Sequence, residues 1–156
     1  MPEVDGEKSD SVQHQYNETV LFFPSQGQVC HSYCTFCFRW AQFIGDNDLK
    51  IATKEAGQLK KYIQAHPEIT DVLITGGDPL VMKTKNLRAH IEPLLELEQI
   101  RTIRIGSKAL TFWPQRVVSD DDAQDLLDLF REVQASGKHL ALMAHYNHWQ
   151  ELETDI

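Results

Sequence analysis

The sequence has few cysteines, no long apolar run and no excess of basic residues, and each shortage argues against a class of protein. Its three cysteines are an odd number and follow no secretory signal, so a disulfide framework is not expected. No apolar run approaches the roughly 20 residues of a membrane-spanning helix, and the acidic start at residues 1–5 is unlike a signal peptide. We therefore expect no membrane association and a reducing, cytoplasmic location for the thiols.

Charge and length limit the function further. The formal net charge is −8, which disfavours a broad phosphate-binding surface, so nucleic acid is not an expected partner. With 156 residues, of which 42% are hydrophobic, the chain is long enough for one domain with a substantial core. Residues 1–18 are mostly polar and are predicted to form a flexible lead-in. The domain itself is expected to cover residues 19–156.

All the cysteines lie in one short stretch, where Cys30, Cys34 and Cys37 follow the spacing C-x3-C-x2-C. Thiolates this close together are typical of ligands to a soft metal centre, and iron–sulfur clusters are held in this way. Three cysteines would leave one iron of a cubane cluster open for chemistry. The alternatives are a zinc site, completed by His31 or a distant histidine, and an unliganded group of core thiols.

Apolar patterning predicts strands that alternate with helices along the chain. Residues 20–23 form a strand or a packed segment, and strands are expected at 71–75, 101–105 and 139–144. The last of these is a continuous apolar run, which is typical of a strand buried on both faces. Strands and helices alternate at βαβ spacing, so we expect an α/β fold with parallel strands.

Three helices are expected between these strands. Thr53 is placed to cap the first, which Pro67 ends. The second covers residues 87–95 and contains Pro93, where a kink or a break is predicted. Ser119 is placed to cap the third, with carboxylates in its first turn, and Gly137 is placed to end it.

Polar residues follow each of the last three predicted strands, at 76–79, 106–108 and 145–148. In parallel α/β folds the active site lies at the carboxyl ends of the strands. If the strands are neighbours, these three segments face one side, and the cysteine loop joins them if it follows a first strand. The pattern therefore predicts a single site built from separate parts of the chain.

At these residues the sequence resembles the radical SAM superfamily and, within it, the lysine 2,3-aminomutase family. The resemblance runs from about Phe23 to the end of the chain. The motifs that carry it follow the family's order: Cys30–Cys37 continued by Phe38-Arg39, then Gly76-Gly77-Asp78-Pro79-Leu80, Ile103-Arg104-Ile105-Gly106-Ser107 and Met143-Ala144-His145-Tyr146-Asn147-His148.

The resemblance implies a partial parallel (βα) TIM-like barrel of the radical SAM type, with about four βα units in this chain. A [4Fe–4S] cluster would be held by the three cysteines, and S-adenosylmethionine (SAM) would bind the open iron. Phe36 occupies the position that borders the adenine, and Gly76, Gly77, Asp78 and Pro79 correspond to the segment that receives the methionine amino end. Ser107 and His145 are the further cofactor-binding candidates.

The resemblance also implies an activity. Reductive cleavage of SAM would give a 5′-deoxyadenosyl radical that abstracts hydrogen from an amino-acid substrate, for 2,3-amino migration. In the family this substrate is held as an imine on pyridoxal phosphate, and Arg39 stands where an arginine binds its carboxylate. The expected partners are the small-molecule substrate and a reductant such as flavodoxin or ferredoxin; an oligomer is compatible with the sequence.

Two features depart from the family. Lys108 stands where the aminomutases usually have arginine, which suggests a side branch whose substrate need not be lysine. None of the lysines matches the pyridoxal-phosphate lysine, which in the family lies beyond the fourth strand. We therefore expect a C-terminally incomplete piece of a longer enzyme. The alternative is a non-catalytic iron–sulfur or zinc-binding fragment, or a paralogue that lacks the pyridoxal-phosphate site.

Overall fold

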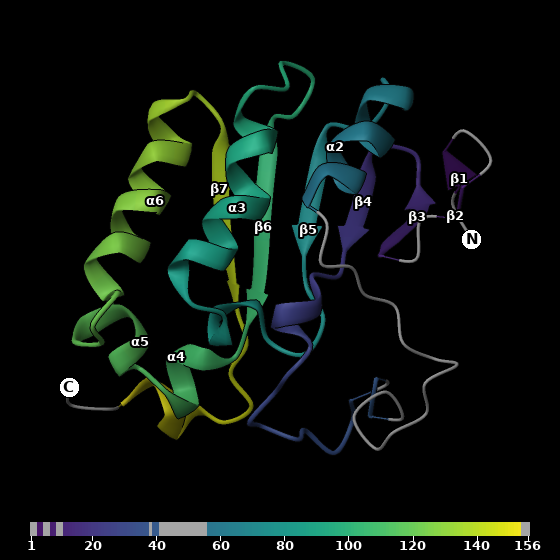
Figure 1. The fold of residues 1–156 in the computed structure, drawn as a ribbon. Coiled ribbons are helices and arrows are strands. Elements are labelled where there is room, and N and C mark those ends of the chain that lie inside the picture. Colours follow the sequence, from purple (N-terminus) through teal and green to yellow (C-terminus); the bar gives the residue numbers. More distant parts are fainter. Residues whose placement is uncertain (1–2, 5–6, 9–10, 38, 41–55, 154–156) are drawn as a thin grey trace.

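The computed structural model describes residues 3–4, 7–8, 11–37, 39–40 and 56–153. Its centre is a five-stranded sheet in the order β3-β4-β5-β6-β7 (Figure 1). Strands β4 to β7 are parallel to one another, and β3 runs antiparallel to β4. The predicted α/β class with parallel strands is therefore confirmed, whereas closure into a barrel stays a prediction.

The element bounds follow the predicted alternation closely. Within the described ranges, no helix combines the length and the apolar character needed to cross a bilayer. The strands are β1 (Glu3–Val4), β2 (Glu7–Lys8), β3 (Val12–Tyr16), β4 (Thr19–Phe22), β5 (Asp71–Ile74), β6 (Thr102–Ser107) and β7 (His139–Ala144). The α-helices are α2 (Ala56–Ala65), α3 (Thr84–Leu95), α4 (Ala109–Phe112), α5 (Gln115–Val118) and α6 (Ala123–Ala135), and the 3-10 helices are η1 (Ser25–Gly27), η3 (Pro79–Val81) and η4 (Trp149–Leu152).

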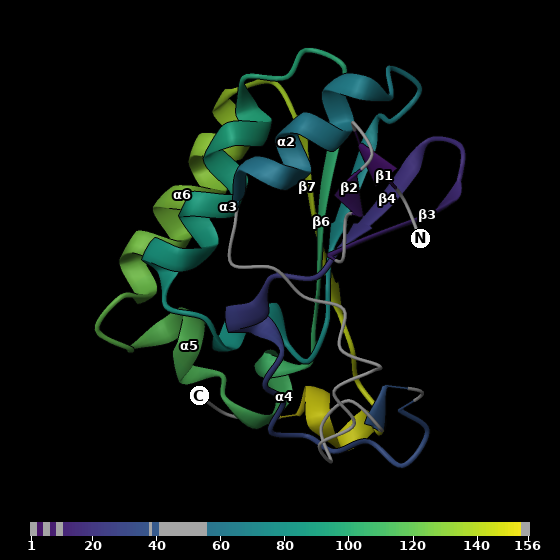
Figure 2. The same cartoon turned by 45° about the vertical axis from the view of Figure 1, so that its right-hand side comes forward.

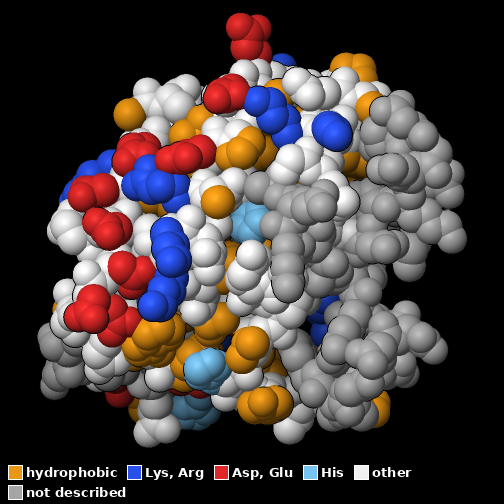
Figure 3. Space-filling model, in the orientation of Figure 1, with side chains coloured by type: hydrophobic (Ala, Val, Ile, Leu, Met, Phe, Trp, Pro, Cys, Tyr) orange, Lys and Arg blue, Asp and Glu red, His pale blue; other side chains and the backbone are white. Residues whose placement is uncertain are grey.

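Helices α2, α3 and α6 lie on one face of the sheet, as the two ribbon views agree (Figures 1 and 2). Alternate residues of β4, β5 and β6 are fully buried under them, among them Phe22, Ile74 and Ile105. Together with the apolar faces of the helices they form one hydrophobic core. Charges of both signs alternate over the outer surface of these helices (Figure 3).

The edges of the sheet differ from the sequence-based expectation. Residues 1–18 were predicted as a flexible lead-in, yet residues 12–16 form the edge strand β3, with Val12 buried. At the other edge, β7 is partly exposed along its length, so the prediction of a strand buried on both faces is wrong. β7 pairs with β6 alone among the described strands, and Met143 is 48% exposed. An apolar run cannot by itself distinguish a central strand from an edge strand.

Two helix predictions also need correction. Helix α3 continues through Pro93 and ends two residues later, because the proline lies in the last turn, where little helix remains to be disrupted. Ser119 does not cap α6 but ends α5, and Asp122 is the residue before α6. Gly137, at φ +82°, follows the helix end as predicted. The proposed cap Thr53 lies outside the described residues.

The acidic start of α6 is tied into the protein interior. The Arg116 guanidinium, only 1% exposed, donates to the Asp122 carboxylate at 2.9 Å and to the Leu80 carbonyl at 2.8 Å. The Thr84 amide donates to the other oxygen of the same carboxylate. Although partial burial opposes the change, the Thr84 hydrogen bonds and the Arg116 charge lower the pKa of Asp122. These contacts join the start of α3 to the start of α6.

His90 gives the fold a predicted pH dependence. The side chain is buried in α3, with its ring 5.2 Å from that of Phe22, and burial lowers the pKa of His90. The unfolded chain, with a histidine pKa of about 6.5, therefore takes up a proton first, and stability falls as the pH drops through that value. Between about pH 7.5 and 5.5 the proton taken up by the unfolded chain lowers the free energy of unfolding by at most about 1.4 kcal/mol.

The prediction is tested by urea unfolding at the two pH values. His90→Gln should lose less stability on acidification than the parent chain. His139→Gln, at an exposed residue of β7, is the matched control and should behave like the parent. An unchanged pH dependence in His90→Gln would contradict this role.

Candidate functional site

A cavity of about 540 Å³ lies at the carboxyl ends of the parallel strands. The cysteine loop and the ends of β5, β6 and β7 contribute to its wall, so the predicted convergence of separate segments is confirmed. The lining residues include all three cysteines and most of the predicted site: Phe23, Cys30, Cys34, Phe36, Cys37, Arg39, Thr75, Gly76, Gly77, Asp78, Gly106, Ser107, Lys108 and His145. Pro79 begins η3 beside this wall and is buried.

The cysteine loop follows β4 and η1, and its three thiols are free and partly buried. The Cys37 amide donates to the Cys34 carbonyl at 2.9 Å, which closes a turn between the second and third thiols. Tyr33 lies at φ +44°, an uncommon conformation for a residue with a side chain. The loop thus brings three partly buried thiols to the wall of one cavity, and three thiols are a donor set that fits an iron–sulfur cluster.

Gly76 and Gly77 lie against the segment that leads into the cysteine loop. The Gly77 amide donates to the Gly27 carbonyl at 3.1 Å, and the Asp78 amide donates to the Val29 carbonyl at 2.9 Å. A Cβ on Gly77 would lie 2.4 Å from that Val29 oxygen. Gly76 has φ +145°, and a Cβ there would meet the Gln28 side chain. The glycines therefore allow a close approach to the chain's own backbone, in addition to any approach to a ligand.

Asp78 is a buried link between the ends of β5 and β6. Its side chain is 1% exposed, and Oδ1 accepts hydrogen bonds from the Ser107 hydroxyl at 2.7 Å and the Leu80 amide at 3.0 Å. Its other oxygen, Oδ2, accepts from the Lys108 amide at 2.8 Å. Ser107 in turn accepts from the Ala109 amide at 3.0 Å. The chain's own donors thus occupy most of the carboxylate that sequence reasoning assigned to a ligand ammonium.

Arg39 lines the same cavity but is only 5% exposed. Its guanidinium lies 4.1 Å above the centre of the Phe23 ring, and Nη2 donates to Gln28 Oε1 at 2.9 Å. Burial lowers the pKa of Arg39 to about 10, against the opposing effect of Cys37. The side-chain amide of Gln28 also donates, through Nε2, to the Pro24 carbonyl at 3.0 Å. Arg39 is therefore packed against the segment that leads into the cysteine loop.

Aromatic and imidazole rings form the exposed rim of the cavity. Phe36, 65% exposed, lies with its ring 5.5 Å from that of His145. The His145 amide donates to the Ser107 carbonyl at 2.9 Å, which places this histidine directly after the last paired residues of β6 and β7. Two rings at this distance leave exposed apolar surface that suits a flat heterocycle.

An ion pair that the sequence did not predict joins the loops after β6 and β7. Lys108 Nζ donates to both carboxylate oxygens of Glu151 at 2.9 Å. The Asn147 amide donates to the same carboxylate at 2.7 Å. The Lys108 hydrogen bond is the largest cause of a lowered pKa at Glu151. Since the partners are separated by 43 positions, only the folded chain shows the pair.

The fold and the site define an α/β protein with a cavity at the carboxyl edge of a mostly parallel sheet, walled by a three-cysteine loop. No protein-family profile matches the chain. A putative L-lysine 2,3-aminomutase of Aquifex aeolicus is 41% identical over 145 residues, which are 93% of this chain and 37% of that protein. The resemblance to the lysine 2,3-aminomutase family that the motifs indicate is therefore confirmed.

Two further relatives agree. The L-lysine 2,3-aminomutase of Acetoanaerobium sticklandii is 30% identical over 139 residues, 89% of this chain and 31% of that protein. That of Bacillus subtilis is 34% identical over 104 residues, 67% of this chain and 21% of that protein. The chain thus spans between about a fifth and two fifths of the length of these relatives. The roles of individual site residues stay predictions.

Proposed function

We propose that this chain forms the cluster- and SAM-binding part of a radical SAM enzyme of the aminomutase type. The observation that supports it best is the shared cavity, whose wall combines the cysteine loop with the glycine pair, Ser107 and His145. These segments come from four separate parts of the sequence. A structural role for the thiols alone gives no reason for the other three segments to line the same space.

In this proposal Cys30, Cys34 and Cys37 would hold a [4Fe–4S] cluster with one iron open, and SAM would bind at that iron. When bound, the reduced cluster would supply the electron for cleavage of SAM to the 5′-deoxyadenosyl radical. Gly77 keeps the loop in place and Asp78 fixes the ends of β5 and β6. Phe36 would border the adenine, and His145 would lie beside SAM. The remaining task of the protein is to exclude water and to orient the substrate.

The substrate proposed for this site is an amino acid, with 2,3-amino migration as the reaction of the whole protein. Arg39 is the candidate for the substrate carboxylate, because it lines the cavity beside the cysteine loop and a guanidinium can bind a carboxylate through two hydrogen bonds. The exposed sheet face opposite the helices would then face the inside of a partial (βα) barrel. Pyridoxal phosphate, a flavodoxin or ferredoxin reductant and a cytoplasmic location complete the proposal; the pyridoxal-phosphate lysine has no match in this sequence.

Formation of 5′-deoxyadenosine by the anaerobically reconstituted, reduced chain tests the proposal. The parent chain should form it from SAM, and Cys34→Ala should not, because one cluster ligand is lost. Thr35→Ala, at an exposed neighbouring residue without an assigned role, is the matched control and should retain activity. A parent chain that carries a cluster but never cleaves SAM would contradict the proposal and support a non-catalytic iron–sulfur module.

A further inference from the structure

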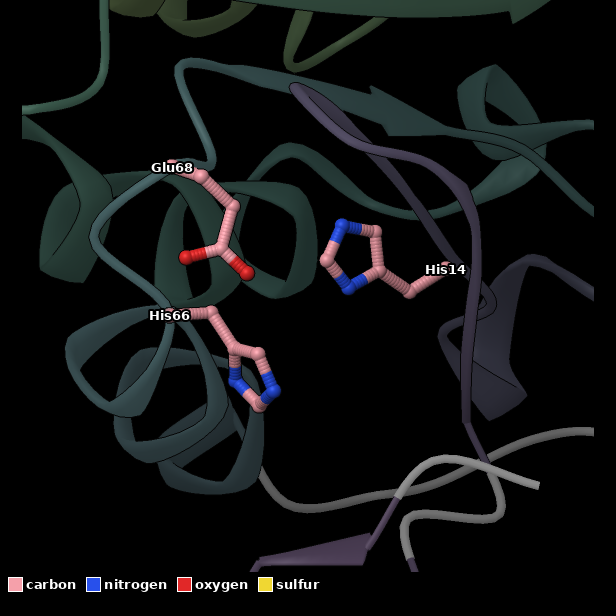
Figure 4. Close-up of side chains that lie close together, drawn as sticks. All are labelled: His14, His66 and Glu68. Carbon is pink, nitrogen blue, oxygen red and sulfur yellow. The ribbon is translucent and has the colours of Figure 1, made fainter.

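A second group of metal-ligating side chains lies away from the cysteine loop, between β3 and the end of α2. One ligand atom from each of His14, His66 and Glu68 lies within 4.8 Å of the others. All three side chains are partly buried, so solvent can reach them. Figure 4 shows the two imidazoles and the carboxylate directed toward a common space. The proposed function makes no use of these residues.

Hydrogen bonds fix the tautomer of His66 in the form that binds metals. Its Nδ1 lies 2.8 Å from the Tyr62 carbonyl oxygen. A carbonyl only accepts, so Nδ1 carries the proton and Nε2 keeps its lone pair. A backbone carbonyl on the other nitrogen is the usual orientation of a histidine ligand in metalloproteins.

The same argument applies to His14. Its Nε2 lies 3.1 Å from the Asn17 carbonyl oxygen and is therefore the protonated nitrogen. The lone pair of Nδ1 accepts from the Tyr62 hydroxyl at 2.9 Å. Pairing with β4 shifts register between Gln13 and Tyr16, so His14 lies at an irregularity of an edge strand, where side chains are often redirected.

We propose that His14 Nδ1, His66 Nε2 and the Glu68 carboxylate bind one divalent transition-metal ion, with a fourth position open to water. Two imidazoles and one carboxylate are a donor set that zinc accepts. Neighbouring ligand atoms of a tetrahedral zinc site lie about 3.3 Å apart, so these atoms, which lie within 4.8 Å of one another, must approach by at most about 1.5 Å.

The neighbouring Tyr62 supports the site from α2. Its ring stacks on His66 with centroids 4.2 Å apart and meets His14 edge-on at 5.7 Å. A metal on His14 would replace the hydrogen bond from the Tyr62 hydroxyl. A bound ion would join β3 to α2 across 52 positions of sequence, from His14 to His66.

Zinc titration tests the site separately from the thiols. The parent for this experiment is the full chain with Cys30, Cys34 and Cys37 replaced by serine. It should bind one Zn²⁺, measured by calorimetry, and its melting temperature should rise with zinc but not with magnesium. His66→Gln should weaken zinc binding at least about tenfold, since even outer-shell changes cost that much.

Two further variants decide the outcome. Glu68→Gln, which keeps the size of the side chain, should also weaken binding, while His139→Gln, on β7, should leave it unchanged. Circular dichroism establishes that each variant is folded. Absence of one-to-one zinc binding in the parent would overturn the proposal. So would folded His66→Gln and Glu68→Gln variants that bind zinc as tightly as the parent does. Because this parent lacks the three cysteines, the result does not depend on whether the cysteine loop binds a cluster.

Discussion

Gly77→Ala is expected to prevent assembly of the cysteine loop and to cost about 2–3 kcal/mol of stability. The new methyl group would lie 2.4 Å from the Val29 carbonyl oxygen, a backbone atom that no rotamer change can move aside. The contact can be relieved only by separating the two segments. That separation would break the hydrogen bonds by which the Gly77 and Asp78 amides hold residues 27 and 29. The cysteine loop, which starts one residue later, would lose its support.

The effect is measured by iron content after anaerobic reconstitution and by urea unfolding. Gly77→Ala should lose most of its bound iron as well as stability. Gly57→Ala is the matched control, because a Cβ there meets nothing within 4 Å. It lies on the exposed side of α2 and should stabilise the chain by about 0.5–1 kcal/mol with unchanged iron binding. A Gly77→Ala chain with full iron content would show that the loop does not depend on this contact.

Asp78→Asn is expected to destabilise the chain by about 2–3 kcal/mol, although the two side chains have nearly the same shape. One amide oxygen can still accept from Ser107 and Leu80. The amide nitrogen would then face the Lys108 amide, so two donors would oppose each other in a buried position 2.8 Å apart. Flipping the amide only moves the conflict to the Ser107 and Leu80 donors.

The control for this prediction is Asp128→Asn in α6, where the carboxylate is 48% exposed and pairs with Arg131 on the same helix. Exposed pairs of this kind contribute little, so the change should stay within about 0.5 kcal/mol. Urea unfolding of both variants at neutral pH gives the comparison. Equal stabilities for Asp78→Asn and Asp128→Asn would mean that the buried carboxylate does not hold the strand ends together.

Gly77→Ala and Asp78→Asn together also distinguish two explanations of the Gly-Gly-Asp-Pro segment. If the segment only contacts SAM, its substitution lowers SAM affinity and leaves the free chain stable. If it also supports the cysteine loop, as the contacts of Gly77 and Asp78 indicate, stability falls before any ligand is added. The unfolding measurements in the absence of SAM therefore separate the structural role from the binding role.

The position of the candidate site could be predicted from the sequence, because it follows from strand polarity. Parallel strands place their carboxyl ends at one edge, so Gly76, Gly106 and His145, each at or after a strand end, had to approach one another. The cysteine loop joins them because β4 pairs with β5 in parallel. Local apolar patterns were sufficient to predict β5, β6 and β7, whereas residues 20–23, which form most of β4, were predicted only as a strand or a packed segment.

The partners of individual side chains could not be predicted. Asp78 bonds to residues about 30 positions away, and Gly77 packs against backbone 48 positions earlier. The sequence around an aspartate does not show whether its carboxylate binds a ligand or accepts three hydrogen bonds from its own chain. The edge strand β3 was missed for a related reason, since backbone pairing with β4 places it in the sheet despite few apolar residues.

The most direct test of the central claim is electron paramagnetic resonance of the reconstituted, dithionite-reduced chain with and without SAM. If the cavity at the carboxyl edge assembles both the cluster and the SAM pocket, a cubane signal should appear and should shift when SAM is added. The shift would report SAM at the open iron. A cubane signal that SAM leaves unchanged would contradict the claim that these segments form one cofactor site.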